Sequence, residues 1–260
     1  MIDIHNHIIY GVDDGSRSID ESLEMVNLYK KAGFSEIIAT SHYDKSRYIT
    51  HPDDIIKKAD ILNSRIEKDG IDFKIYPGQE IQVEVDTLEK IKKGEVLSLN
   101  NSRYVLCELS FASKPNFLKD LIYQMQLEGY VPIIAHAERY PYVSEDINWL
   151  LDFIKMGALI QVNYSSIKSH HDTMRQLLER NMVHIIATDA HQSKWRSPYI
   201  VECKDEIIDI IGEDKFDKLS RINPSLVIED KYIDTEYGNI VKERKKEKRS
   251  FLKFWRKKWI

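Results

Sequence analysis

The fold of this chain is decided by the stretch Met1-Ile-Asp-Ile-His-Asn-His-Ile-Ile-Tyr-Gly-Val-Asp-Asp-Gly15. A short apolar run leads into His5-x-His7, and the acidic turn Asp13-Asp14-Gly15 follows. In an extended strand, side chains two residues apart point to the same face, so both imidazoles can reach one ion. Two histidines alone make a poor site. The stretch therefore predicts a metal site only if later strands supply more ligands.

Later segments end in the same way. Apolar runs close on His, Glu or Asp in segments 37–42, 75–80, 105–108, 133–136 and 185–191, and the polar residues are His42, Glu80, Glu108, His136, Asp189 and His191. The carboxyl ends of parallel strands lie on one face of an α/β fold, so these side chains should converge in one bowl. So many titratable groups need cations to offset desolvation and like-charge repulsion.

The ligand chemistry limits the choice of metal. Nitrogen and oxygen ligands without thiolate suit Mn, Fe or Zn, and this number of ligands fits two or three ions. Such sites activate water to hydroxide near neutral pH and clamp phosphoryl oxygens. The other histidines lack a strand-end context and are interpreted as structural or solvent-facing: His51, His170, His171 and His184.

Strand and helix patterns alternate along the chain. The predicted strands are 2–7, 36–41, 73–80, 103–109, 131–136, 158–163 and 183–189. The predicted helices include 18–32, 52–68, 115–128, 145–156 and 171–181, the first opened by a capping box at Ser18. This alternation predicts a parallel α/β fold, and 260 residues suit one barrel domain. We expect residues 1–240 to form that domain and residues 241–260 to form a tail.

Composition excludes several classes of protein. No apolar run approaches the ~18 residues that span a membrane, and the N-terminus lacks a signal-peptide pattern. The two cysteines form no motif, so a reduced, cytoplasmic protein is expected. A cysteine phosphatase needs Arg six residues after its Cys, but Ser113 follows Cys107 and Asp209 follows Cys203 at that spacing. That mechanism is excluded.

The tail differs in charge from the rest of the chain. Residues 242–260 hold ten Lys/Arg and two Glu, a balance of +8, so residues 1–241 carry −12 of the total of −4. Phe251, Trp255 and Trp259 recur every four residues among these basic residues, which is typical of a peripheral anchor on anionic lipid. Docking on a partner kinase and a solvated, unstructured end are the alternatives. Because the body is acidic, nucleic-acid binding is not expected.

Seven motifs together make the chain recognisable. They are Met1-Ile-Asp-Ile-His-x-His, Val12-Asp-Asp-Gly15, Ala39-Thr-Ser-His42, Pro77-Gly-Gln-Glu80, Tyr104-Val-Leu-Cys-Glu108, Ala135-His-Ala-Glu-Arg-Tyr140, and Ala187-Thr-Asp-Ala-His191 with Arg196 close behind. With them the chain resembles the PHP (polymerase and histidinol phosphatase) superfamily. More narrowly, it is similar to the manganese-dependent protein tyrosine phosphatases of Gram-positive capsule and exopolysaccharide loci, the CpsB/YwqE type.

The resemblance implies a distorted (β/α)7 barrel, the PHP fold, with three metal ions. One ion would take His5, His7, Glu80 and Asp189; a second would share Glu80 and add Glu108 and His136; the third would take Asp14, His42 and His191. Asp13 replaces Asp14 if the turn is shifted by one residue. Arg139 and Arg196 match positions that grip the substrate phosphate.

The resemblance also implies a function. The enzyme would dephosphorylate a membrane-associated tyrosine kinase that controls capsular or exopolysaccharide synthesis, by attack of a metal-activated hydroxide on phosphorus. The tail could hold it peripherally at the inner membrane face. The ligand cluster itself does not dictate phosphotyrosine over other phosphate esters. A PHP phosphoesterase for a small metabolite of the histidinol phosphate type, and a metal-filled scaffold without activity, are the alternatives.

Overall fold

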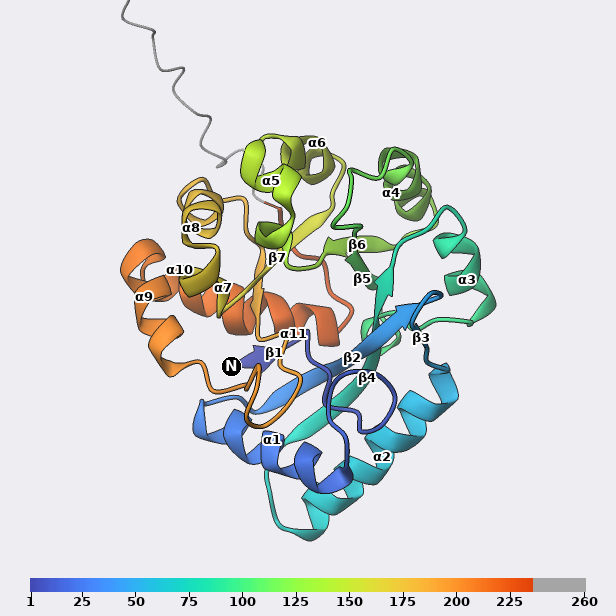
Figure 1. Ribbon diagram of the computed structural model, residues 1–260, viewed down its shortest axis with the longest axis vertical. Helices are drawn as coiled ribbons and strands as arrows, with labels where there is room; N and C mark the ends of the chain where they lie inside the picture. The colour runs from blue at the N-terminus through green and yellow to red at the C-terminus, as the bar shows by residue number, and fades with distance from the viewer. Residues whose placement is uncertain (236–260) are drawn as a thin grey trace, which may run out of the picture.

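Parallel strands form the frame of the molecule (Figure 1). The computed structural model describes residues 1–235 of the chain. The strands are β1 (Ile2–Asp3), β2 (Glu36–Asp44), β3 (Tyr48–Ile49), β4 (Lys74–Gln82), β5 (Tyr104–Glu108), β6 (Val131–Ile134), β7 (Leu159–Asn163) and β8 (Ile185–Ala187). Their order is β1-β2-β4-β5-β6-β7-β8 with every neighbour parallel, and β3 turns back antiparallel onto β2.

The sheet closes on itself between its first and last strands. Asn6 and Ala190 form a parallel bridge. The amide of His7 donates to the carbonyl of Ala190 (2.8 Å), and the amide of Asp189 donates to the carbonyl of His5 (2.8 Å). Within residues 1–235, the result is a nearly closed α/β barrel of seven parallel strands, which confirms the predicted (β/α)7 barrel.

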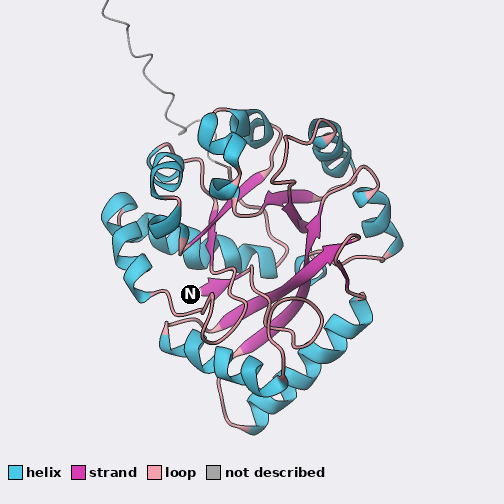
Figure 2. Cartoon of the chain, in the orientation of Figure 1, coloured by secondary structure: helices cyan, strands magenta, loops and turns pink. Residues whose placement is uncertain are grey.

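Helices surround the strands on the outside (Figure 2). They are α1 (Ile19–Lys31), α2 (Pro52–Lys68), α3 (Thr87–Lys93), α4 (Leu118–Leu127), α5 (Pro141–Glu145), α6 (Trp149–Lys155), α7 (Ser166–Ser169), α8 (His171–Glu179), α9 (Val201–Ile211), α10 (Glu213–Asp217) and α11 (Asn223–Ile228). Short turns lie at η1 (Leu99–Asn101), η2 (Ala137–Arg139) and η3 (Lys218–Ile222), the last of them π-helical. None of these described helices is long and apolar enough to cross a membrane.

Some predicted boundaries were wrong for local reasons. The first strand, predicted as 2–7, ends at Asp3, because the Asn6 side chain donates to Asp3 and to the carbonyl of Ile38 where ladder bonds would continue. The helix predicted from residue 145 begins at Trp149, since Asp146 is extended and separates it from α5. The helix predicted from residue 115 begins at Leu118. Helices after residue 181, and β3, were missed.

The core has two layers, because each strand is buried on both faces. Ile37 packs outward in the cluster beneath the helices, whereas Ile38 packs inside the barrel. Ile134 and Ile133 divide in the same way. This is the period of two expected of parallel strands. The inner apolar layer fills the barrel interior, and the polar residues lie beyond it at the carboxyl ends of the strands.

Candidate metal centre

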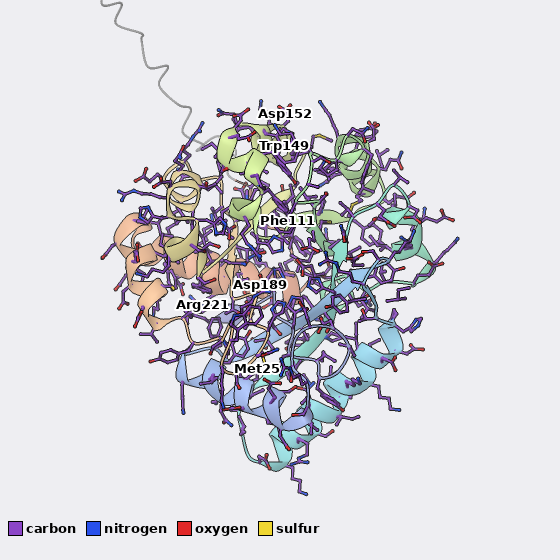
Figure 3. The ribbon with its side chains drawn as sticks, viewed as in Figure 1. Met25, Phe111, Trp149, Asp152, Asp189 and Arg221 are labelled. Carbon is purple, nitrogen blue, oxygen red and sulfur yellow. The ribbon has the colours of Figure 1, made fainter. Side chains whose placement is uncertain are left out.

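Strand register brings the predicted ligands together at the carboxyl end of the barrel. In the pairing of β2 with β4, His42 lies opposite Glu80. In the pairing of β4 with β5, Glu108 lies opposite Gln82, one pleat further along. His136 and Asp189 each follow the end of their strand by two residues. Asp189 is labelled near the middle of the molecule in Figure 3, inside the ring of strands.

Glu80 is the centre of this cluster. Its carboxylate is 1% exposed, so every polar neighbour matters. Oε2 lies 3.2 Å from His5 Nε2, 3.4 Å from His7 Nε2 and 3.1 Å from His42 Nδ1. Oε1 lies 2.8 Å from His136 Nε2. One carboxylate therefore contacts four imidazoles: two from the segment after β1, one from β2 and one from the turn after β6.

Asp189 divides its two oxygens between the cluster and its surroundings. Oδ1 faces the cluster, 3.5 Å from His5 Nε2, 3.4 Å from His7 Nε2 and 3.6 Å from His191 Nδ1. Oδ2 faces away and accepts hydrogen bonds from the side chains of Asn163 (2.8 Å), Arg139 (2.9 Å) and Arg196. These hydrogen bonds hold Oδ2 in place, and Oδ1 remains directed at the imidazoles.

Asp14 and Asp13 have different surroundings. Asp14 Oδ1 lies 3.5 Å from His191 Nε2 and 3.6 Å from His42 Nε2, at the open side of the cluster. Burial alone would raise the pKa of Asp14, but His191 and His42 hold it below its usual value. The Asp13 side chain is buried, and it accepts from His7 Nδ1 (2.9 Å) and from the amide of His42 (2.9 Å). Asp14 therefore faces the cluster, and Asp13 positions its histidines.

The turn that carries both carboxylates requires a glycine. A Cβ added at Gly15 would lie 2.1 Å from the carbonyl oxygen of His7 and 2.5 Å from its Cβ, which no side chain tolerates. The amide of Gly15 donates to Asp13 Oδ1 (3.0 Å). The acidic turn thus packs closely against His7, and the third residue of the motif Asp-Asp-Gly must be glycine because a side chain there would clash.

Hydrogen bonds fix the tautomers of three histidines. Nδ1 of His5 bonds to Gln161 Oε1 (3.0 Å), Nδ1 of His7 to Asp13, and Nδ1 of His191 to the carbonyl of Asp189 (3.0 Å). Since oxygen only accepts here, each Nδ1 carries the proton and each Nε2 keeps its lone pair. Metal-binding histidines in proteins are oriented in this way.

Within residues 1–235, three buried polar atoms at the centre have no hydrogen-bond partner: Nε2 of His5, Nε2 of His7 and Oε2 of Glu80. Unpartnered buried polar atoms are rare and costly. Here they converge as two lone pairs and one carboxylate oxygen, which is a donor set that fits a divalent cation. The residues present therefore fit the metal ions that the sequence predicts.

Ligand atoms within 4.8 Å of one another form four overlapping groups among the described residues. They are His7 with Asp14, His42 and His191; His5 with His136 and Asp189; His5 with His7 and Glu80; and His42 with Glu80 and Glu108. All nine predicted ligands are included. The grouping differs from the partition that the resemblance implies, since His136 groups with His5 and Asp189, although its Nε2 also lies 3.6 Å from Glu108.

Electrostatics in the cluster are strongly perturbed. Burial and the neighbouring Glu80 raise the pKa of Glu108 to about 8. Although burial alone would lower it, Glu80 and Asp189 raise the pKa of His5 to about 9. Perturbed groups of both signs in one place are typical of functional sites. A bound cation competes with these protons, because it needs the carboxylates ionised and the imidazoles neutral.

Arg139 and Arg196 lie at the edge of the cluster, where both contact Asp189. Arg196 also donates from a guanidinium nitrogen to His191 Nε2 (3.0 Å). Three residues of the site adopt left-handed backbone conformations without being glycine: His136 (φ 32°), Asp189 (φ 52°) and Arg196 (φ 51°). Such conformations persist where the surrounding structure imposes them, often at functional sites.

Sequence reasoning missed the residues that support the ligands. Gln161 accepts from His5 and from the amide of His136, and its amide nitrogen donates to Asn163. Asn163 in turn donates to Asp189. The two alternate along β7, so polar residues with period two inside an otherwise apolar strand were the available signal. The sequence analysis also missed Asp3 as a supporting residue; its buried carboxylate accepts hydrogen bonds from the hydroxyls of Tyr29 and Thr188.

The histidines predicted to be structural stay outside the cluster. His184 precedes β8 and is 4% exposed, and its Nδ1 accepts from the amide of Ile160 (3.0 Å). His51 is exposed at the start of α2. His170 and His171 lie at the start of α8. Cys107 is buried, and this burial raises the pKa of its thiol to about 12, so it is no nucleophile.

These features define the class as a nearly closed α/β barrel with a cluster of potential metal ligands at its carboxyl end. A histidinol phosphate phosphatase from Lactococcus lactis shares this fold, with a TM-score of 0.55 at 14% identity over 81% of this chain and 93% of that one. The chain belongs to the CpsB/CapC family of capsular polysaccharide synthesis, which it matches over residues 1–229. This confirms the predicted family.

A curated protein and a solved structure each match most of the chain. The tyrosine-protein phosphatase YwqE of Bacillus subtilis is 36% identical over 202 residues, which are 76% of this chain and 80% of that protein. A crystal structure from work on YwqE of B. subtilis and CpsB of Streptococcus pneumoniae, described as metal-dependent tyrosine phosphatases, is 32% identical with a TM-score of 0.88. It covers 94% of this chain and all of its own.

Proposed function

We propose that this chain is a metal-dependent protein tyrosine phosphatase. The observation that carries the proposal is the set of imidazoles locked at Nδ1, with Nε2 directed at Glu80 and Asp189. The relatives named tyrosine-protein phosphatases support the reaction and the substrate class. The small-metabolite alternative has less support, since the histidinol phosphate phosphatase shares only the fold.

We assign the metal ligands as the nine residues predicted from sequence: His5, His7, Asp14, His42, Glu80, Glu108, His136, Asp189 and His191. Manganese is the proposed metal, in two or three ions, with iron and zinc as alternatives. When bound, such ions neutralise phosphoryl oxygens and provide a water-derived nucleophile near neutral pH. Asp13, Gln161 and Asn163 hold the ligands in the orientation that this requires.

Arg139 and Arg196 bind and orient the phosphate in this proposal. Each guanidinium has five N–H donors, of which one or two are used on Asp189 and His191. The remaining donors are available for bidentate hydrogen bonds to phosphate oxygens. Because Asp189 holds both arginines at the cluster edge, the phosphate is gripped next to the ligands.

The leaving group needs little help from the protein. A tyrosine phenol has a pKa of ~10, well below that of an alkyl alcohol, so it departs more readily as an anion. This favours phosphotyrosine as the substrate. The carboxylates and imidazoles of the cluster are already engaged with one another, so a leaving group that needs little protonation suits this site. Neither cysteine takes part.

The proposed partner is a membrane-associated tyrosine kinase of a capsule or exopolysaccharide locus. The basic, aromatic stretch 242–260 would hold the enzyme at an anionic bilayer and so raise its concentration near that kinase. This stretch lies outside the described residues, and the proposal for it rests on its sequence. Deletion of 242–260 should abolish binding to anionic liposomes; unchanged binding would remove this part of the proposal.

The function is tested with enzyme stripped of metal by a chelator. Adding Mn²⁺, Fe²⁺, Zn²⁺ or Mg²⁺ singly should restore hydrolysis of a phosphotyrosine peptide, with Mn²⁺ giving the highest kcat. Histidinol phosphate at equal enzyme serves as the competing substrate. Failure of every metal to restore phosphotyrosine hydrolysis, or faster turnover of histidinol phosphate, contradicts the proposal.

A further inference from the structure

A cavity of about 320 Å³ opens beside the cluster, and three proposed ligands line it: Asp14, His42 and Glu108. Two aromatic side chains complete its walls. Tyr48 comes from the β2–β3 hairpin, and Phe111 comes from the loop after β5. A group bound at these ligands would project its substituent into the space that the two rings border. The volume lies in the range of small-molecule pockets and exceeds that of a single ring.

Each aromatic ring packs against a proposed ligand. Tyr48 stacks on His42 with ring centroids 5.7 Å apart and planes inclined by 12°. Phe111 stacks on His136 at 5.7 Å and 28°. Phe111 is 41% exposed, so much of its ring remains uncovered. Both rings are thus held by the cluster and keep surface for a further aromatic group.

Phe111 is also tied to the phosphate-binding edge. The Arg139 guanidinium lies over the Phe111 ring, 5.5 Å from its centroid, and donates to Asp189 from the same end. A phosphate held by Arg139 would therefore have an aromatic wall directly beside it.

A second cavity, which Asp189 helps to line, is less suited to the ring. It has about 340 Å³, and its lining includes Arg139, Arg196 and the rim residue Tyr199. Among the proposed ligands, only Asp189 reaches it. The Oδ2 atom of Asp189 already accepts from both arginines and Asn163. Both arginines line this second cavity, whereas Tyr48 and Phe111 line the first, and Arg139 connects the two because its guanidinium also lies over the Phe111 ring.

We propose that Tyr48 and Phe111 form the pocket for the phenyl ring of phosphotyrosine and determine the preference for aryl over alkyl phosphates. This inference rests on the proposed phosphatase function. In phosphotyrosine a ring separates the ester oxygen from Cβ, whereas in phosphoserine that oxygen is bonded to Cβ directly. Only the aryl ester places a flat apolar group between the cluster and the peptide backbone, where the two rings can contact it.

The test measures equilibrium binding of two non-hydrolysable anions that differ in the ring, phenylphosphonate and methylphosphonate, to the manganese-loaded full chain. We expect the wild-type protein to bind phenylphosphonate more tightly. Phe111→Leu and Tyr48→Leu should each weaken phenylphosphonate by about threefold to tenfold and leave methylphosphonate unchanged. Phe111→Tyr, which keeps an aromatic ring at this position, should retain the preference for phenylphosphonate. The matched control Tyr199→Leu, on the rim of the second cavity, should leave the affinity ratio unchanged.

Two results overturn the inference. One is a phenylphosphonate preference that survives both leucine variants or falls in Tyr199→Leu, because the ring then binds elsewhere. The other is an equal loss for both phosphonates, because Phe111 and Tyr48 then act through the ligands. Failure of the proposed function looks different: the wild-type enzyme would not hydrolyse a phosphotyrosine peptide, whatever its phosphonate affinities.

Discussion

The two ends of the barrel both bury histidine and other polar side chains, but they use them in opposite ways. At the amino end, His184 Nδ1 accepts from the amide of Ile160. Asn223 donates to the carbonyl of His184 (2.7 Å), and Lys215 donates to the carbonyl of Leu178 (3.0 Å). At the carboxyl end, Nε2 of His5 and of His7 face carboxylates without a hydrogen-bond partner.

The difference shows what separates a structural histidine from a ligand. A buried imidazole whose acceptor nitrogen is used by a backbone amide contributes to the fold and has nothing left for an ion. An imidazole whose Nδ1 is held by a hydrogen bond and whose Nε2 has no hydrogen-bond partner is arranged to coordinate a metal ion. Burial alone does not distinguish the two, since His184 is 4% exposed and His5 is 0%.

The largest expected effect is at Glu80, the carboxylate at the centre of the cluster. Glu80→Gln removes the charge that four imidazoles share, so kcat for a phosphotyrosine peptide should fall about a thousandfold or more. The matched control is Glu36→Gln at the amino end, where the carboxylate accepts from the hydroxyl of Tyr76. Metal content by mass spectrometry should fall only in the first variant. Full activity in Glu80→Gln would remove the distinction between the two ends.

The next effect is at the arginines. Arg139→Lys keeps the charge but loses the fork of donors, so kcat/KM should fall about tenfold to a hundredfold. Arg103→Lys is the control, because Arg103 precedes β5 at the amino end and pairs with Asp230. The two variants should differ in steady-state kinetics with a phosphotyrosine peptide. Equal kinetics in both would mean that Arg139 has only a structural role.

Within the carboxyl end, Asp13 and Asp14 allow a residue that positions a histidine to be compared with a proposed metal ligand. Asp13→Asn weakens the orientation of His7 and should lower manganese affinity about tenfold to a hundredfold at unchanged stoichiometry. Asp14→Asn should remove a ligand and so reduce the number of ions bound. Calorimetric titration with Mn²⁺ separates affinity from stoichiometry. A lower stoichiometry for Asp13→Asn would exchange the two roles.

The smallest effect is expected at the amino end. Burial lowers the pKa of His184 to about 4, below the 6.5 of an exposed histidine. The unfolded chain therefore binds this proton more strongly, so the stabilisation is complete above pH ~6.5 and is lost as the pH falls toward 4. Between pH 7 and pH 5 the wild-type protein should lose about 2 kcal/mol more than His184→Gln in urea unfolding. The exposed His51→Gln should follow the wild-type curve; identical slopes for all three proteins would contradict the prediction.

Much of the candidate site was predictable because ligands end predictable strands. His42, Glu80, Glu108 and His136 each close an apolar, β-branched run, and parallel pairing brings such ends together whatever the details of packing. The length of the first strand was not predictable, because it depends on side-chain bonds of Asn6 to Asp3 and Ile38. The proposed tail 241–260 stays a prediction.

The partners of the supporting residues could not be identified from the sequence. Gln161 contacts His5 across 156 positions of sequence, and Thr188 contacts Asp3 across 185. These contacts exist only because β7 and β8 complete the barrel beside the first strand. A polar residue inside an apolar strand gives no indication of its partner until the sheet closes.

The sequence by itself determined the alternation of strands and helices, the family, and the residue types of the candidate metal ligands, because these follow from local periodicity and residue type. Only the tertiary structure decided which oxygen of Asp189 faces the cluster, which imidazole nitrogens carry protons, and that Asp13 supports while Asp14 faces the ligands. The reason is that a hydrogen bond or an ion contact depends on which atoms are adjacent in space, and barrel closure sets that adjacency between residues far apart in the chain.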